Sequence, residues 1–258
     1  MPLTLLLSIF VGAAHAATPI ALKASDGVAI HAVASEIKGS TNGVVLAHML
    51  GRDSADWASM TKRLQTTKMS TVAVDFRGHG KSANTDAAME PADYAAMLED
   101  LKAATAWLRE RGVTNVSCVG ASLGANLCAQ LGAADPGIVN LVLLSPGLNY
   151  KGVTSGGALK TYGDRPVLIV AAEDDRFGPR NAEALEGMAQ GQVHYELLPE
   201  GGHGTKMLTR ASNLEPMVMS WLAGTFQLMS GDLVRPQAEV KTKTSAIETS
   251  GKKMQVHQ

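Results

Sequence analysis

The stretch Asn115-Val116-Ser117-Cys118-Val119-Gly120-Ala121-Ser122-Leu123-Gly124 decides how this chain of 258 residues folds. Its first half is a short apolar run, typical of a buried strand, and residues 125–131 that follow it have the composition of a helix. The pattern G-x-S-x-G lies between them. Such a turn exposes a serine hydroxyl above a sheet, while its glycines let strand and helix approach closely. A glycine-rich turn without any chemistry has the same pattern, so the rest of the chain must decide between the two.

Apolar runs alternate with helical patterns along most of the chain. Residues 20–24 and 28–34 flank the turn Ser25-Asp26-Gly27 and predict an antiparallel hairpin. Continuous apolar runs, which a sheet covered on both faces requires, predict strands at 44–47, 71–74, 115–119, 141–144, 166–172 and 193–198. Apolar residues at helical spacing predict helices at 53–66, 91–111, 125–131, 181–189 and 207–227, the last with a break before Pro216. The alternation predicts an α/β fold, a doubly wound and mostly parallel sheet with helices on both faces.

The composition limits the partners of the protein. Hydrophobic residues make up 45% of the chain and supply the core of one large domain, which we expect at residues 17–229. A formal net charge of -1 provides no basic field for nucleic acid, and no run of like charge indicates binding to an anionic membrane surface. We therefore expect a small molecule as the partner. The sequence does not specify an oligomeric state.

The two ends of the chain differ from this domain. Residues 3–12 are almost wholly apolar and Ala14-His15-Ala16 has the small-x-small pattern of a signal-peptidase site, so residues 1–16 predict a signal peptide and a secreted or periplasmic protein. The apolar run is shorter than the roughly 20 residues that span a bilayer, so we expect no stable membrane span after cleavage. Apolar periodicity stops after residue 229, and residues 230–258 predict a disordered tail.

The chain has two cysteines, which lie four residues before Ser122 and six residues after it. Strand and helix geometry places Cys118 and Cys128 at similar heights but in different layers. Because a disulfide requires Cα atoms within about 7 Å, we expect two buried free thiols. Neither cysteine has the spacing of a zinc site, and no other pattern indicates a metal or a cofactor.

Candidate catalytic groups follow three of the predicted strands. A serine that attacks an acyl group needs a base, a carboxylate that orients the base, and hydrogen-bond donors for the oxyanion. Loops at the carboxyl ends of strands supply such groups in an α/β sheet. Asp174 and Asp175 follow the strand that ends at residue 172, and His203 follows the strand that ends near residue 198. The order serine, aspartate, histidine is that of one hydrolase architecture.

Five features occur together in chain order. They are His48 after an early strand, the segment DFRGHGKS at 75–82, the G-x-S-x-G turn, Asp175 with Pro179 four residues later, and Gly202-His203-Gly204. On these features, residues 28–227 resemble an α/β-hydrolase-fold serine hydrolase of the esterase and lipase-like superfamily. The resemblance implies that Ser122 is the nucleophile, that His203 is the general base and then the general acid, and that Asp175 orients His203. The family's spacing to a proline favours Asp175 over Asp174, for which a solvated or turn-capping role is the alternative.

The resemblance also implies an oxyanion hole made by two backbone N–H groups. One belongs to Leu123, directly after the nucleophile, and the other to the loop after His48. Related hydrolases have His-Gly-x-Gly there, whereas this chain has Met49 in place of the first glycine, which makes Leu50 the expected donor. If that first glycine has positive φ in related hydrolases, Met49 in its place would carry backbone strain. The methionine side chain would also narrow the substrate site.

Other polar residues have structural interpretations. We expect His48 to fix its loop rather than to act as a second base, and Arg77 and His79 to hold the loop after Asp75 by hydrogen bonds. Gly80-Lys81-Ser82 resembles the end of a phosphate-binding loop. Such a loop requires a glycine at position 75, where this chain has Asp75, so nucleotide binding is rejected.

The segment between the strands that end at residue 145 and begin at residue 166 is where the family often inserts a lid. This segment allows at most a short flap, so we expect little or no lid and an open site. Leu148, Tyr150 and Val153 are candidates for the substrate pocket, with loop packing as the alternative. The leading expectation is an exported hydrolase that cleaves a carboxylic ester through an acyl-enzyme. The alternatives are an amidase, thioesterase, peptidase or lysophospholipase, and a non-catalytic binding protein on the same scaffold.

Overall fold

The computed structural model describes residues 16–82 and 89–224 of the chain. The chain divides into two units, residues 1–226 and 227–258, of which the second lies outside the described residues. The predicted signal peptide at 1–16, apart from its last residue, and the predicted tail at 230–258 also lie outside them.

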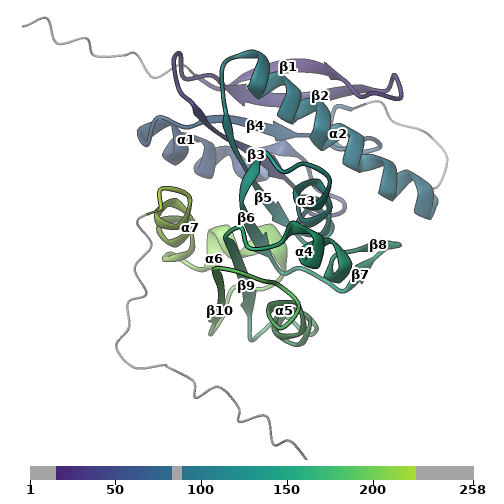
Figure 1. Cartoon of the computed structure of the whole chain (residues 1–258), viewed down its shortest axis with the longest axis vertical. Helices are drawn as coiled ribbons and strands as arrows, with labels where there is room; N and C mark the ends of the chain where they lie inside the picture. The colour runs from purple at the N-terminus through teal and green to yellow at the C-terminus, as the bar shows by residue number, and fades with distance from the viewer. Residues whose placement is uncertain (1–15, 83–88, 225–258) are drawn as a thin grey trace, which may run out of the picture. The chain divides into compact units, whose positions relative to one another are not determined.

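Eight strands form one sheet in the order β1-β2-β4-β3-β5-β6-β9-β10 (Figure 1). Neighbouring strands from β4 to β10 run parallel, whereas β2 is antiparallel to both β1 and β4. All eight strands, including the first hairpin, correspond to strands predicted from the sequence. The strands are β1 (Thr18–Lys23), β2 (Ala29–Ser35), β3 (Asn42–Ala47), β4 (Ser70–Val74), β5 (Asn115–Ala121), β6 (Ile138–Leu144), β9 (Val167–Ala172) and β10 (Val193–Leu198).

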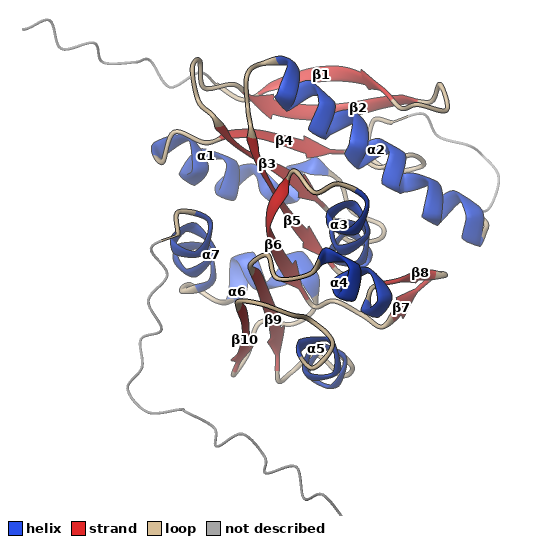
Figure 2. Cartoon of the chain, in the orientation of Figure 1, coloured by secondary structure: helices blue, strands red, loops and turns tan. Residues whose placement is uncertain are grey.

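Helices cover both faces of this sheet, as Figure 2 shows. Side chains alternate along β3, so Val45 faces one hydrophobic core and Leu46 the other. The first core contains residues of α2 (Pro91–Glu110), α3 (Leu123–Ala134), α4 (Gly156–Tyr162) and α5 (Gly178–Glu186). The second contains residues of η1 (Ser54–Trp57), α1 (Ala58–Thr66), α6 (Met207–Arg210) and α7 (Leu214–Leu222). Because both faces are covered, the central parallel strands are mostly apolar and buried, and the predicted doubly wound α/β class is confirmed.

The predicted break in the last long helix is also present. A short helix, η2 (Gly204–Lys206), leads into α6, which ends at Arg210, and α7 begins at Leu214. Pro216 lies in the first turn of α7, where the N–H that proline lacks has no helical acceptor. The proline therefore fits the start of the second helix rather than the middle of a continuous one.

The strand order reverses beside β3. The chain leaves β3 for β4 on one side and later returns to β5 on the other side. Loops that leave the carboxyl ends of β3 and β5 therefore diverge, and ligands of open α/β sheets bind in the crevice at such a point. His48 follows β3 and Ser122 follows β5, so the fold places both residues at this crevice.

Both glycines of the G-x-S-x-G turn are required by close packing. A Cβ atom on Gly120 would lie 2.3 Å from the carbonyl oxygen of Gly124. A Cβ atom on Gly124 would lie 2.4 Å from the carbonyl oxygen of Ala47, at the end of β3. Any other residue at these positions would push α3 away from β5 and β3.

Cys118 on β5 and Cys128 on α3 form a disulfide, with Cα atoms 5.6 Å apart. The expectation of two free thiols is wrong. That expectation assumed that the strand and the helix lie in layers too far apart for a disulfide. The close contacts at the glycines instead bring α3 directly against β5. The disulfide joins the two elements that flank Ser122.

We predict that the protein, denatured without reductant, has no titratable thiol, and that it has two after reduction. Replacement of both cysteines by alanine should lower the free energy of unfolding by about 3 kcal/mol, because the crosslink no longer restricts the unfolded chain. Urea denaturation measures this loss. Reduced wild-type protein is the matched control, since it lacks the bond but keeps both sulfur atoms. Two thiols in the denatured, unreduced protein would contradict the disulfide.

Candidate active site

Three side chains at the carboxyl edge of the sheet form one hydrogen-bonded chain. Ser122 follows β5, Asp175 follows β9 and His203 follows β10. Nε2 of His203 lies 2.8 Å from Oγ of Ser122, and Nδ1 of His203 lies 2.6 Å from Oδ2 of Asp175. Ser122 and Asp175 are buried, and His203 is partly exposed. The structure thus brings together the three residues that the sequence singled out.

Ser122 has a strained backbone, with φ of 53° and ψ of -117°. Residues with a side chain rarely adopt positive φ, and such strain concentrates at functional sites. The Ser122 N–H donates to the carbonyl oxygen of Leu144 at 2.8 Å, and α3 begins at the next residue. Contacts on both sides of the serine therefore hold its conformation.

The two neighbouring aspartates have different partners. Oδ1 of Asp174 accepts hydrogen bonds from the N–H groups of Gly201 at 3.0 Å and Gly202 at 2.8 Å, in the loop that carries His203. The side chain of Asp175 reaches His203 itself, and a Cβ atom on Gly178 would lie 2.4 Å from its Oδ2. The geometry agrees with the preference for Asp175 as the partner of His203, and Asp174 caps the loop.

Ser145, at the end of β6, also supports this loop, although no pattern in the sequence predicted this role. The residue is fully buried and has φ of 47°. Its Oγ accepts a hydrogen bond from the N–H of Gly204 at 3.0 Å, and its carbonyl oxygen accepts one from the Tyr150 hydroxyl at 3.4 Å. Ser145 therefore links the residue after His203 to Tyr150. Nothing in the sequence distinguishes it from an ordinary turn residue at the end of a strand.

Met49 does not carry the expected strain. Positive φ in its loop occurs at Gly51, at 73°, and not at Met49, so that expectation is wrong. The glycine that the loop needs lies two positions later. Sδ of Met49 lies close to Gly204, where an added Cβ atom would be 2.9 Å from it. The methionine thus packs against the loop that carries His203.

A cavity of about 290 Å³ lies at Ser122. Met49 and Tyr150 line it, and so do Leu50 and Leu123, the two expected oxyanion donors. Leu123 is the first residue of α3, so its N–H has no acceptor within the helix. The full lining consists of Met49, Leu50, Ser122, Leu123, Asn149, Tyr150, Lys151 and His203.

Leu148 and Val153 lie outside this lining. The side chain of Leu148 is 40% exposed, and Val153 is fully buried in the core that contains α3. Asn149 and Lys151, which no pattern in the sequence predicted as site residues, line the cavity instead. The Tyr150 ring stands edge-on to the imidazole of His203 with centroids 6.0 Å apart, and burial raises the pKa of its hydroxyl, which is therefore neutral near pH 7.

The segment after β6 forms a flap rather than a full lid. It contains the hairpin of β7 (Asn149–Tyr150) and β8 (Val153–Thr154), followed by α4. Nδ2 of Asn126, on α3, donates to the carbonyl oxygen of Val153 at 2.8 Å, and its Oδ1 accepts from the N–H of Gly147 at 3.0 Å. The Ser155 hydroxyl donates to the carbonyl oxygen of Gly147 at 2.5 Å. The two bonds of Asn126 hold the flap against α3, and the Ser155 bond joins two parts of the flap.

Comparison with known proteins agrees with this architecture. A profile of the family described as serine aminopeptidase, S33, matches residues 40–162. No curated protein matches the sequence. A solved structure of DcsB, in complex with its substrate analogue, is 14% identical, with a TM-score of 0.71 over 82% of this chain and 100% of that chain.

Two esterases of known structure are also similar. The Pyrococcus furiosus esterase Pf2001 is 15% identical, with a TM-score of 0.68 over 81% of this chain and 90% of that chain. Est1E from Butyrivibrio proteoclasticus, solved with ferulic acid bound, is 17% identical, with a TM-score of 0.64 over 79% of this chain and 99% of that chain. The chain has the α/β-hydrolase fold. The structural matches show its fold, and the family match supports a hydrolase activity.

In this α/β-hydrolase-fold protein, His48 fixes its loop as predicted. The imidazole is fully buried, its Nδ1–H donates to the Met49 carbonyl oxygen at 2.8 Å, and its Nε2 accepts from the Phe76 N–H at 3.1 Å. Burial lowers its pKa from 6.5 to about 4, so the ring is neutral near pH 7. Arg77, one residue beyond Phe76, forms an ion pair with the buried carboxylate of Asp100 at 2.6 Å.

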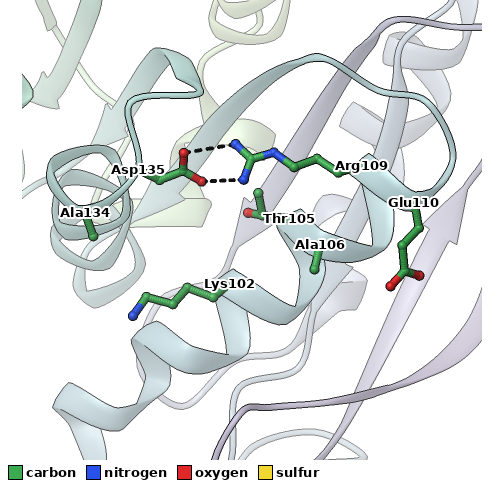
Figure 3. A pocket seen from close by; sticks show the side chains of 7 residues that line it. All are labelled: Lys102, Thr105, Ala106, Arg109, Glu110, Ala134 and Asp135. Atoms are coloured by element: carbon green, nitrogen blue, oxygen red, sulfur yellow. Dashed lines mark hydrogen bonds and ion pairs between the residues drawn. The ribbon is translucent and has the colours of Figure 1, made fainter.

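A larger cavity, of about 460 Å³, lies between α2 and the end of α3 (Figure 3). Its charged groups have partners within the protein: Arg109 pairs with Asp135 at 2.8 Å, and Lys102 pairs with Glu99 at 2.7 Å. None of its lining residues belongs to the hydrogen-bonded chain of Ser122. Volume alone therefore does not make it the reaction site.

No helix within residues 16–82 and 89–224 is long and apolar enough to cross a membrane. The same ranges contain no group of three or more histidine, cysteine, aspartate or glutamate side chains that could hold a metal ion.

His48 gives the stability of the protein a defined pH dependence. Its folded-state pKa of about 4 lies below the ordinary value of 6.5, so on acidification the unfolded chain takes up a proton that the folded chain does not. Its stabilising effect is complete above about pH 6.5 and is lost as the pH falls toward 4. We predict that the unfolding free energy of wild type, minus that of His48→Asn, decreases by up to about 3 kcal/mol between pH 7 and pH 4.

Urea titrations of both proteins at several pH values measure this difference. Other titrating groups cancel in it, because both proteins contain them. A difference that does not change with pH would contradict the prediction.

Proposed function

We propose that this protein is a serine hydrolase that cleaves carboxylic esters through an acyl-enzyme. The hydrogen-bonded chain from Asp175 through His203 to Ser122 carries this proposal. With Asp175 ionised, Nδ1 of His203 keeps its proton, which leaves Nε2 free to accept the proton of the Ser122 hydroxyl. Asp175 then stabilises the imidazolium that forms.

The reaction has two halves. Ser122 Oγ attacks the ester carbonyl carbon while His203 takes its proton, and the N–H groups of Leu123 and Leu50 donate to the oxyanion. His203 then gives the proton to the leaving alcohol oxygen as the carbon–oxygen bond breaks. A water molecule next attacks the acyl-Ser122 ester, with His203 again as the base, and the carboxylic acid leaves as Ser122 regains its proton.

The cavity favours an ester over the substrate of an aminopeptidase, which the description of the matching family suggests. An aminopeptidase must accommodate a free amino terminus, which is an ammonium group near pH 7. The residue with a permanent charge in the cavity lining is Lys151, whose own ammonium would repel such a substrate. Amides, thioesters and lysophospholipids are alternatives that a substrate panel separates.

We predict that wild type hydrolyses short p-nitrophenyl esters and that Ser122→Ala and His203→Ala each lower kcat by about 10³-fold or more. Asp175→Asn should lower kcat by about 10⁴-fold, because the amide stabilises the wrong tautomer of His203. Asp174→Asn is the matched control, since it changes the adjacent carboxylate, and its loss should be far smaller. Release of p-nitrophenol measures turnover, and circular dichroism confirms that each variant is folded.

A wild-type protein that turns over no ester and does not react with a fluorophosphonate probe would favour the non-catalytic alternative. Equal losses in the two aspartate variants would contradict the assignment of Asp175.

We also propose that the protein is exported and cleaved after Ala16. The apolar segment at 3–12 and the Ala14-His15-Ala16 pattern support this proposal. The disulfide between Cys118 and Cys128 adds support, because disulfides persist mainly in oxidising compartments.

Intact-mass measurement of protein expressed with its native amino terminus in a secreting host tests export. We predict a mature chain that starts at Ala17. The variant Ala16→Arg should block cleavage and retain the full length, because the signal-peptidase site requires small residues. A wild-type product that starts at Met1 would contradict export with cleavage.

A further inference from the structure

The turn between β7 and β8 holds a lysine in a conformation that lysine rarely adopts. Lys151 and Gly152 are its two central residues and have φ of 53° and 90°. Two successive residues with positive φ define the type of hairpin turn for which asparagine followed by glycine is the preferred pair. Asn149 stabilises the turn, because its Oδ1 accepts a hydrogen bond from the Gly152 N–H at 2.8 Å. The first turn position therefore carries a residue that costs backbone strain.

This strained residue lies at the candidate active site. Lys151 lines the cavity at Ser122, together with its neighbours Asn149 and Tyr150. Its side chain is exposed, and in the described part of the chain its Nζ forms no ion pair. The contact recorded for Nζ is with the ring of Tyr94 on α2, at 5.9 Å from the centroid. The ammonium thus keeps its charge available to a molecule in the cavity.

The position of Lys151 relative to Ser122 is fixed by one helix. Asn126 lies one turn after Ser122 on α3, and its side chain binds the backbone before the hairpin, at Gly147, and in its second strand, at Val153. The hairpin and the nucleophile therefore share one rigid support. Asp175, the acidic residue of the hydrogen-bonded chain, is bonded to His203 and is not among the lining residues.

We propose that Lys151 binds a carboxylate on the acyl or alcohol part of the substrate and selects esters with this negative charge over neutral esters. This inference rests on the proposed ester hydrolysis. One ammonium balances one negative charge, so a carboxylate fits the site better than a phosphate dianion. This role explains why the strained position carries a lysine. Asparagine would suit the turn better, but it has no charge with which to bind a carboxylate.

The test uses two pairs of esters that differ by one charge. The first pair is mono-(p-nitrophenyl) glutarate and its methyl ester, which place or remove a carboxylate on the acyl side. The second pair is 3-carboxyphenyl butyrate and its methyl ester, which do the same on the alcohol side. At low salt, wild type should prefer the charged member of at least one pair by about fivefold in kcat/KM, as expected for a partly solvated charge pair. Added salt should reduce this ratio.

Variants at position 151 assign the preference to the lysine. The ratio of kcat/KM for the charged ester to kcat/KM for its methyl ester should fall to about 1 in Lys151→Gln and below 1 in Lys151→Glu. Lys160→Gln, which removes an exposed lysine from α4 in the same segment but outside the cavity lining, is the matched control and should keep the wild-type ratio.

Lys151→Asn provides an independent measurement. It should lose the charge preference and raise Tm, because asparagine tolerates positive φ better than lysine does. A lower Tm would contradict the strain argument on which the inference depends. Equal kcat/KM within both ester pairs, or a preference that Lys151→Gln retains, would overturn the inference while the proposed hydrolysis stands. No turnover of any of the four esters would overturn both.

Discussion

The close contact of α3 with β5 and the end of β3 is the constraint on which the site depends. Two glycines permit it, since a Cβ atom on either would collide with backbone atoms. The turn between strand and helix is consequently so tight that Ser122 takes positive φ. The same contact brings Cys118 within bonding distance of Cys128 and sets the first N–H of α3 beside the serine. The packing of α3 against β5 and β3 therefore determines the geometry at the nucleophile.

Hydrogen bonds and packing from several elements determine where His203 lies. Asp175 binds its ring, and Asp174, the preceding residue, binds the backbone of the loop that leads to it. Ser145, after β6, binds the N–H of Gly204, and Met49, after β3, packs against the same glycine. These contacts come from the ends of β3, β6 and β9. A loop with little secondary structure is thereby given a defined position by the ends of three strands.

Much of this architecture follows from the sequence because it depends on patterns that are local in the chain. Continuous apolar runs identify the strands, and the order of Ser122, Asp175 and His203 at strand ends identifies the three residues that meet. The disulfide was not predicted, because it depends on the distance between β5 and α3, which the two glycines shorten. Ser145 was missed, and Leu148 was wrongly placed in the substrate pocket, because backbone conformation and side-chain direction in short loops depend on tertiary contacts.

The hydrogen bonds from α3 to the flap reach only the main chain of the flap. Asn126 binds a carbonyl oxygen and an N–H of the flap, and Gln130 binds a second carbonyl oxygen, that of Thr154. Anchors of this kind do not depend on which side chains residues 148–151 carry. The flap can thus exchange its cavity-facing residues, by evolution or by engineering, while its attachment to the helix of the nucleophile stays the same. Under the proposed function, substrate choice and the reaction itself depend on separable parts of the chain.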